Sequence, residues 1–185
     1  MIGKRIICIS GFSQDFAHPS GIEVLWERLR QSFSNFECCV TMYPWRSDWK
    51  AIASHIVRTG RPTGIDVRVA AYSWGAGHGF VKLALALMNQ GVNIKVAVLS
   101  DPVYRNAWML WRSLWSPILG EPVISIPENV GKVLYLRQQM VWPHGHKCVS
   151  KSGKTAIEDH GFLVRPHVWM DDAREFHDLA WTNMS

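Results

Sequence analysis

A single serine stands among small residues where an apolar segment gives way to a helical pattern. The segment 66–72 reads as a buried strand, and residues 71–75 (AYSWG) place Ser73 directly after it, with small residues at 75–77. A tight turn from strand to helix needs such neighbours, because its backbone is strained and the helix passes close to the strand. The pattern predicts either an acyl-transfer nucleophile at Ser73 or a serine that only caps the next helix.

A carboxylate follows the next apolar segment along the chain. Residues 94–100 end directly before Asp101, and the carboxyl ends of parallel strands share one edge of a sheet. We therefore expect Asp101 at the same edge as Ser73, where an acid could orient the base that takes the serine proton. The competing interpretation is a turn aspartate that precedes a proline.

The elements that must position these groups alternate between strand and helix. Runs of β-branched and other apolar residues predict strands buried on both faces at 5–10, 37–43, 66–72, 94–100 and 132–137. Helical periodicity predicts helices at 22–33, after a capping box at Ser20 and Glu23, and at 48–58, 76–90 and 171–181. This order predicts one domain, 1–185, of the α/β class: a three-layer α/β/α sandwich with a mainly parallel sheet of five to six strands.

Composition limits the function classes. The 185 residues are 48% hydrophobic and 19% charged, and no apolar run approaches the roughly 20 residues that span a bilayer. The net charge of +5 is scattered, which argues against a nucleic-acid partner. No signal peptide is evident and the four cysteines lack CxxC spacing, so we expect reduced thiols in a cytoplasmic protein. Residues 144–148 (HGHKC) depart from standard zinc spacing, and we expect neither a metal nor a cofactor.

Residues 71–75 resemble the nucleophile elbow of the α/β-hydrolase superfamily, G-x-S-x-G, in the version of some lipases that begins with alanine. The resemblance implies the α/β-hydrolase fold in a minimal form and a triad in the order serine, acid, histidine. Ser73 is then the nucleophile and Asp101 the first candidate for the acid. Much of the superfamily takes its acid from after a later strand, and the loop expected there makes Asp159, beside Glu158, the reserve candidate.

The resemblance also selects one of eight histidines. The superfamily's base lies in a loop after the last strand, close to the final helix, and His167 in residues 166–172 (PHVWMDD) matches that place. His160 is the second choice, whereas His177 lies inside the predicted helix. The three histidines that precede the expected position or lie on helices are interpreted as structural: His18, His55 and His78.

Two backbone N–H groups should stabilise the oxyanion of an acyl-transfer reaction. Trp74, which follows the nucleophile, supplies the first. Residues 10–14 (SGFSQ) resemble the His-Gly-Phe loop of the superfamily with serine in place of histidine, so the second donor is assigned to Phe12, with Ser13 or Gln14 as alternatives.

The resemblance implies a serine hydrolase that needs no cofactor and cleaves a small-molecule carboxylic ester through an acyl-enzyme. Trp108, Trp111 and Trp115 share one face of a helical pattern, which predicts either a lid or acyl-binding wall or a face that only covers the core. Ser13 and Tyr72 complete the predicted substrate contacts. The alternative function is a non-catalytic α/β-hydrolase-like protein that binds a partner through its tryptophan-rich surface.

Overall fold

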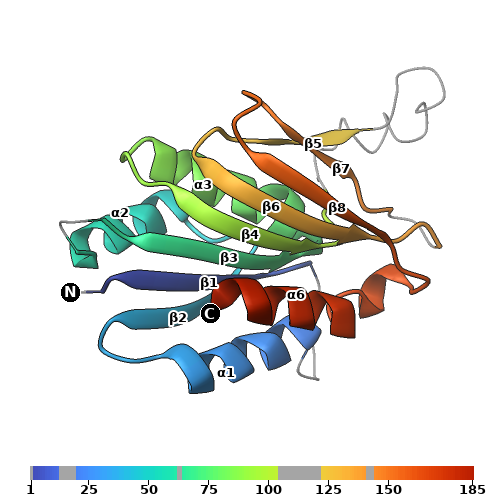
Figure 1. Ribbon diagram of the computed structural model, residues 1–185, viewed down its shortest axis with the longest axis horizontal. Helices are drawn as coiled ribbons and strands as arrows, with labels where there is room; N and C mark the ends of the chain where they lie inside the picture. The colour runs from blue at the N-terminus through green and yellow to red at the C-terminus, as the bar shows by residue number, and fades with distance from the viewer. Residues whose placement is uncertain (1, 13–19, 62–63, 104–121, 141–143) are drawn as a thin grey trace.

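Six parallel strands form the main sheet of the computed structural model, which describes residues 2–12, 20–61, 64–103, 122–140 and 144–185 (Figure 1). Neighbouring strands follow the order β2-β1-β3-β4-β6-β8, and every adjacent pair is parallel. The strands comprise β1 Lys4–Ser10, β2 Cys38–Pro44, β3 Asp66–Tyr72, β4 Ile94–Ser100, β6 Val130–Arg137 and β8 Ala156–Phe162.

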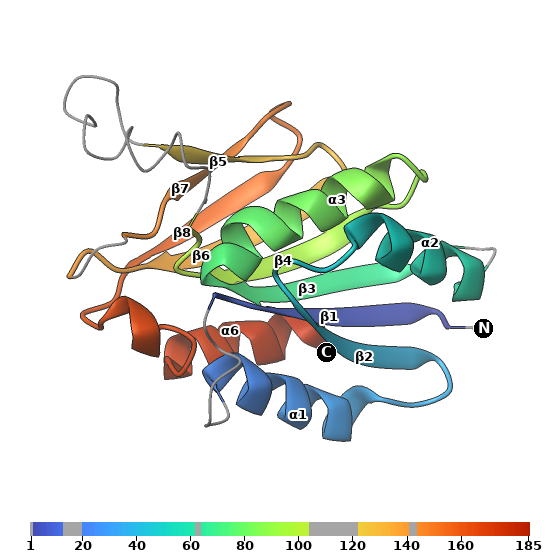
Figure 2. The same cartoon turned by 180° about the vertical axis from the view of Figure 1, so that it is seen from behind.

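Helices cover both faces of this sheet. Figure 1 shows α1 (Gly21–Phe33) and α6 (Arg174–Met184) in front of it, and Figure 2 shows α2 (Trp49–Thr59) and α3 (Phe80–Met88) on the other side. Apolar side chains of the central strands alternate between two cores, one beneath each helical layer. These strands are continuously apolar because both of their faces are covered. The predicted three-layer α/β/α architecture is therefore confirmed.

The direction in which successive strands are added to the sheet reverses at β1. From β1 the chain passes through α1 to β2 on one side, and then through α2 back past β1 to β3 on the other side. Right-handed crossovers consequently place α1 and α2 on opposite faces. The connections that leave β1 and β3 therefore diverge at the carboxyl edge, where doubly wound sheets bind their ligands. Residues 10–12 and Ser73 lie at this point.

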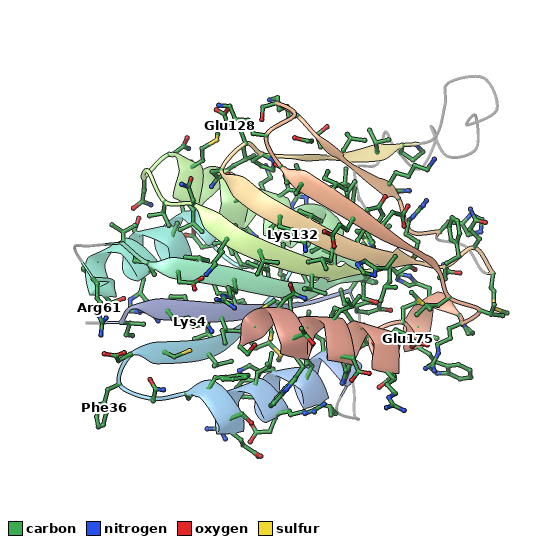
Figure 3. All side chains as sticks on the ribbon, viewed as in Figure 1. Lys4, Phe36, Arg61, Glu128, Lys132 and Glu175 are labelled. Carbon is green, nitrogen blue, oxygen red and sulfur yellow. The ribbon has the colours of Figure 1, made fainter. Side chains whose placement is uncertain are left out.

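The last strand of the sheet was not predicted. Residues 156–162 form β8, whereas the sequence suggested a loop around Glu158 and Asp159. An edge strand whose side chains face water lacks the continuous apolar signal of a central strand. Figure 3 shows Lys132 of β6 on the face of the sheet turned toward the viewer, where its ammonium pairs with Glu158 at 2.9 Å.

Two further segments correct the sequence interpretation. Strands β5 (Val123–Ile126) and β7 (Lys147–Ser150) form a separate parallel pair, which the sequence did not predict. Ile124, Ile126 and Cys148 of this pair belong to the core that lies beneath α2 and α3. Four-residue strands are too short to give a clear periodic signal.

The helical boundaries also differ from prediction. The expected helix 76–90 begins as a π-helical turn, η1 (Gly75–Gly79), in which the N–H of Phe80 donates to the carbonyl of Gly75, and continues as α3. The expected helix 171–181 begins only at Arg174, after a 3-10 turn, η2 (His167–Trp169). Within the described ranges, no helix has the length and apolar character needed to cross a bilayer.

Candidate active site

Ser73 occupies a sharp turn between β3 and η1. Its φ of +54° lies in the left-handed region, and the residue is 3% exposed. The turn is tight because a Cβ at Gly75 would lie 2.5 Å from the carbonyl oxygen of Ile9. A Cβ at Gly11 would likewise lie 2.8 Å from the Cβ of Ser73. A non-glycine residue held at positive φ costs free energy, and such strain is concentrated at functional sites.

Three side chains predicted from distant segments meet at this turn. The Oγ of Ser73 lies 2.8 Å from Nε2 of His167, and Nδ1 of the same ring lies 2.5 Å from Oδ2 of Asp101. An ionised carboxylate only accepts hydrogen bonds, so Nδ1 carries the proton of the neutral imidazole. Nε2 is then the acceptor for the serine hydroxyl, which is the arrangement required of a general base.

Asp101 is held from both of its carboxylate oxygens. The residue is fully buried, has a φ of +43°, and receives the N–H of Gln138 on Oδ1 at 3.0 Å. Its own N–H donates to the carbonyl of Leu136 at 2.8 Å. The end of β6 therefore fixes the carboxylate that faces His167.

The reserve acid is engaged elsewhere. Asp159 accepts hydrogen bonds from the Tyr135 hydroxyl at 2.9 Å, from the guanidinium of Arg137, and from the N–H of Gly161 at 3.0 Å. Partial burial raises the pKa of Asp159, but these hydrogen bonds outweigh burial and hold the pKa below its ordinary value. The geometry favours Asp101 as the partner of His167.

The other late histidines have structural contacts. His160 lies 3.7 Å from the Glu158 carboxylate on the exposed edge strand. The Nε2 of His177 lies 2.8 Å from the carbonyl oxygen of Asp171. In turn, the Asp171 carboxylate accepts the N–H of Ile22 at 3.2 Å at the start of α1, which ties the histidine segment to that helix.

Tyr72 supports the histidine rather than lining open space. The side chain is 3% exposed, and its hydroxyl donates to the carbonyl oxygen of His167 at 2.6 Å. The two rings stack with centroids 5.3 Å apart. A second anchor is the Ser100 hydroxyl, which donates to the carbonyl of Met170 at 2.7 Å. Neighbours of Ser73 and Asp101 in the chain thus hold the segment that presents the imidazole.

Replacing Tyr72 with phenylalanine should lower kcat by about 5- to 10-fold and leave KM nearly unchanged. The ring stays stacked, but the partly buried carbonyl of His167 loses the shorter of its two hydrogen bonds and keeps the one from the N–H of Met170 at 3.1 Å. A single lost hydrogen bond costs about 1–1.5 kcal/mol. Steady-state kinetics on a chromogenic ester measure the change. Tyr135→Phe, which removes the hydroxyl bound to Asp159, is the matched control and should retain its kcat. An unchanged kcat in Tyr72→Phe would contradict this positioning role.

The chain segments assigned to the oxyanion site also meet at Ser73. The backbone at Gly11 passes directly beside the serine, and the Phe12 and Trp74 rings lie 4.3 Å apart. Ser10, which stands where the superfamily has histidine, is buried. The remaining predicted contacts lie outside the described residues: Ser13, Gln14, Trp108, Trp111 and Trp115.

Gly145 is a site residue that the sequence interpretation missed. A Cβ at this position would lie 2.1 Å from Oδ1 of Asp101 and 3.2 Å from the Cγ of Arg137. The neighbouring N–H of His146 donates to the carbonyl of Pro102 at 2.7 Å, which holds this segment against the acid. The glycine between two histidines was considered as part of a metal motif, although a close backbone approach is an equally general reason for glycine.

Alanine at position 145 should lower kcat at least ~100-fold. No side chain fits against the Asp101 carboxylate, so either the acid or the segment must move, and small misplacements of catalytic groups have effects of this size. Kinetics together with thermal unfolding measure the result. Gly153→Ala is the control: its φ of +74° makes alanine strained, but no atom lies within 4 Å of the added Cβ. Equal activity in the two variants would exclude the close contact as the cause.

A metal centre is not apparent in the parts of the chain that the structure describes. Among these residues, no group of three or more His, Cys, Asp or Glu side chains is arranged to hold an ion. Cys148 of the considered HGHKC motif belongs to the apolar core, and burial raises the pKa of its thiol. A thiol that stays protonated is a poor metal ligand.

Solved structures with a similar fold exist. RedJ, a thioesterase from the prodiginine biosynthetic pathway in Streptomyces coelicolor, is 12% identical with a TM-score of 0.53, covering 99% of this chain and 85% of RedJ. A second RedJ structure, with a PEG molecule bound in the active site, gives 12% identity and a TM-score of 0.54 over 100% of this chain and 93% of that one. ClbQ from the colibactin NRPS/PKS pathway is 10% identical with a TM-score of 0.48 over 98% and 95% of the two chains.

Sequence comparison adds no relative to these structural ones. No protein-family model matches the chain, and a search of the curated proteins gives no match. The likeness is therefore one of fold, and the features of this chain that it concerns are the parallel six-stranded sheet and the helices on both faces of that sheet. Together with the RedJ superposition, these features show that the chain has the α/β-hydrolase fold.

Proposed function

We propose that this protein is a serine hydrolase that cleaves a carboxylic ester or thioester through a covalent acyl-enzyme. The observation that carries the proposal is the continuous hydrogen-bonded chain from Ser73 through His167 to Asp101 on a strained turn. A buried serine at positive φ, within 2.8 Å of an imidazole that itself contacts a buried carboxylate, is costly to build for packing alone.

The first half of the proposed reaction forms the acyl-enzyme. Ser73 Oγ attacks the substrate carbonyl carbon as Nε2 of His167 accepts the hydroxyl proton. The carbonyl electrons move onto oxygen, where the backbone N–H groups of Trp74 and Phe12 stabilise the negative charge. When this tetrahedral intermediate collapses, the bond to the leaving group breaks and His167 returns the proton to the departing oxygen or sulfur.

Water completes the proposed cycle. His167 removes a proton from a water molecule that attacks the acyl carbon, and the second tetrahedral intermediate expels Ser73 as its Oγ regains the proton. The products are a carboxylic acid and free enzyme. Throughout, Asp101 keeps the proton on Nδ1 and stabilises the imidazolium, a role suited to its full burial and its hydrogen bond from Gln138.

The leaving group distinguishes two versions of this chemistry. The sequence favours an oxygen ester, whereas RedJ is described as a thioesterase, which brings a thioester into consideration. A thiol has a pKa near 8.5, so a thiolate leaves readily, whereas an alcohol needs the proton that His167 donates. Comparing kcat/KM for an oxygen ester and a thioester of the same acid identifies the better substrate class.

A fluorophosphonate probe tests the proposal without knowledge of the natural substrate. An activated serine displaces fluoride from the phosphorus, so the native protein should gain the mass of one adduct, which tandem mass spectrometry should locate on Ser73. Heat-denatured protein is the control, because the hydrogen-bonded chain is lost on unfolding. A folded protein that gains no adduct, or gains one on another residue, would contradict the proposed function.

A further inference from the structure

Four aromatic side chains lie together beside Ser73. We call this set the aromatic wall: Phe12 after β1, Trp45 after β2, Trp74 after Ser73, and His78 in η1. Ring centroids are 4.3 Å apart for Phe12 and Trp74, 5.0 Å for Trp45 and Trp74, and 5.9 Å for Trp45 and His78. The wall thus combines loops from both sides of the β1 switch point.

The wall is held in place from below. The carbonyl of Trp45 accepts the indole N–H of Trp49 at 3.2 Å, and Trp49 is itself buried in the core. A Cβ at Gly79 would lie 3.0 Å from the Trp49 ring and 3.2 Å from the Trp45 carbonyl oxygen. The start of the helix therefore packs closely against the backbone of Trp45, which fixes the position from which the Trp45 ring extends.

Part of this aromatic surface faces outward. Phe12 is 52% exposed, although Ser73 beside it is 3% exposed, and the other three rings of the wall are each partly exposed. Burial, followed by the positive charge of Lys82, lowers the pKa of His78 below its ordinary value. This shift favours the neutral imidazole, so the wall offers ring faces and edges to an uncharged group.

The position of the wall relative to His167 indicates which part of a substrate it meets. The leaving group must lie near Nε2 of His167, which protonates it, and the histidine segment comes from beyond β8 and packs on Tyr72. The wall instead contains the side chains of Phe12 and Trp74, whose backbone N–H groups receive the carbonyl oxygen in the proposed reaction. Because the leaving group lies on the side of His167, the substituent of the carbonyl carbon on the side of the wall is the acyl group.

We propose that the aromatic wall binds an aromatic ring carried by the acyl group of the substrate. This inference rests on the proposed function and names its substrate class. The wall consists of rings, with tilted and edge-to-face pairs already present between its members. A further ring completes such pairs through its quadrupole, which an aliphatic group of similar size cannot do.

Two esters of equal length separate this recognition from simple burial of apolar area. The p-nitrophenyl esters of 3-phenylpropanoate and 3-cyclohexylpropanoate differ only in the ring, and the cyclohexyl ring is the larger and more apolar one. Burial alone would favour the cyclohexyl ester. Aromatic pairing should instead favour the phenyl ester in kcat/KM by about 2- to 12-fold.

Single substitutions test whether the aromatic wall causes the preference for the phenyl ester. Trp45→Leu should bring the phenyl-to-cyclohexyl ratio of kcat/KM to one or below, with each value expressed relative to hydrolysis of p-nitrophenyl acetate by the same variant. Trp181→Leu is the matched control, because Trp181 is also partly buried but packs at a tilt against Phe33 on the opposite face of the sheet. If Trp45→Leu does not fold, His78→Leu makes the same comparison from the rim of the wall.

The outcomes keep the two proposals apart. A native protein that neither takes the fluorophosphonate adduct nor hydrolyses the acetate would contradict the proposed function itself. A labelled protein that prefers the cyclohexyl ester, or whose phenyl preference survives Trp45→Leu, would overturn the aromatic wall alone. Competition of probe labelling by 2-phenylethylboronic acid against 2-cyclohexylethylboronic acid gives the same ratio without turnover, since both form a reversible adduct with an activated serine.

Discussion

Replacing Ser73 with alanine should abolish the fluorophosphonate adduct and lower ester turnover by at least ~10⁴-fold while the fold persists. The variant loses the only atom that can form the acyl-enzyme in the proposed reaction, whereas the oxyanion donors and the substrate contacts remain. Alanine also keeps a Cβ at the φ of +54°, so the backbone strain of the turn is unchanged. Thermal unfolding should therefore give a Tm close to that of the native protein.

Intact-mass spectrometry, burst kinetics and circular dichroism together measure this result. Ser54→Ala is the control, because Ser54 lies exposed on α2 and accepts only a long 3.3 Å hydrogen bond from Gln90 among the contacts described. The control should keep both adduct and turnover. Adduct formation that survives Ser73→Ala would assign the reactivity to another residue and remove the basis of the mechanism.

Replacing Asp101 with asparagine should lower kcat by about 10⁴-fold. The carboxylate accepts the Nδ1 proton of His167 at 2.5 Å, and an asparagine amide group in its place can donate to Nδ1 instead. The imidazole proton then moves to Nε2, which can no longer accept the proton of Ser73. A change of tautomer with little change in geometry has an effect of this order in serine proteases.

Asp159→Asn is the matched control for this experiment, because Asp159 was the other candidate for the acid. Its partners are Tyr135, Arg137 and Gly161, so turnover should stay within a few-fold of the native value. The ion pair with Arg137, whose side chain is 5% exposed, is weakened, and stability should fall by about 1–2 kcal/mol. Loss of turnover in Asp159→Asn alone would transfer the acid role to Asp159.

The contrast between these two aspartates shows how far local sequence patterns reach. Asp101 was the first candidate because it directly follows the strand predicted at 94–100, and Asp159 was the reserve in a loop expected after a later strand. Asp101 faces His167 because β4 lies beside β3, which brings together residues 66 positions apart. Asp159 lies on the edge strand beyond β6, where its carboxylate accepts a hydrogen bond from the guanidinium of Arg137.

The missed elements have a common physical cause. The five predicted strands were recognisable because their side chains are mostly apolar. Layers of helix, or a neighbouring strand pair, bury these side chains on both faces of the sheet. Strand β8 lies at an edge with polar, exposed side chains, and β5 and β7 are only four residues long. Their pairing depends on hydrogen bonds to neighbours that are far away in the chain.

The sequence by itself determined the buried strands, most of the covering helices and the sharp turn at Ser73. These features depend on periodicity and on small residues next to one another, so each can be read within one short segment of the chain. Ser73, Asp101 and His167 were nominated on the same local grounds, together with the order implied by a resemblance to the α/β-hydrolases.

The tertiary structure alone decided which groups meet. It brought Asp101 rather than Asp159 beside His167, placed Gly145 against the Asp101 carboxylate, turned the Tyr72 hydroxyl toward His167, and brought Phe12, Trp45 and His78 together near Trp74. Each of these contacts joins segments that belong to different strands or helices. Their distances follow from strand order and crossover direction, which no local pattern of residues encodes.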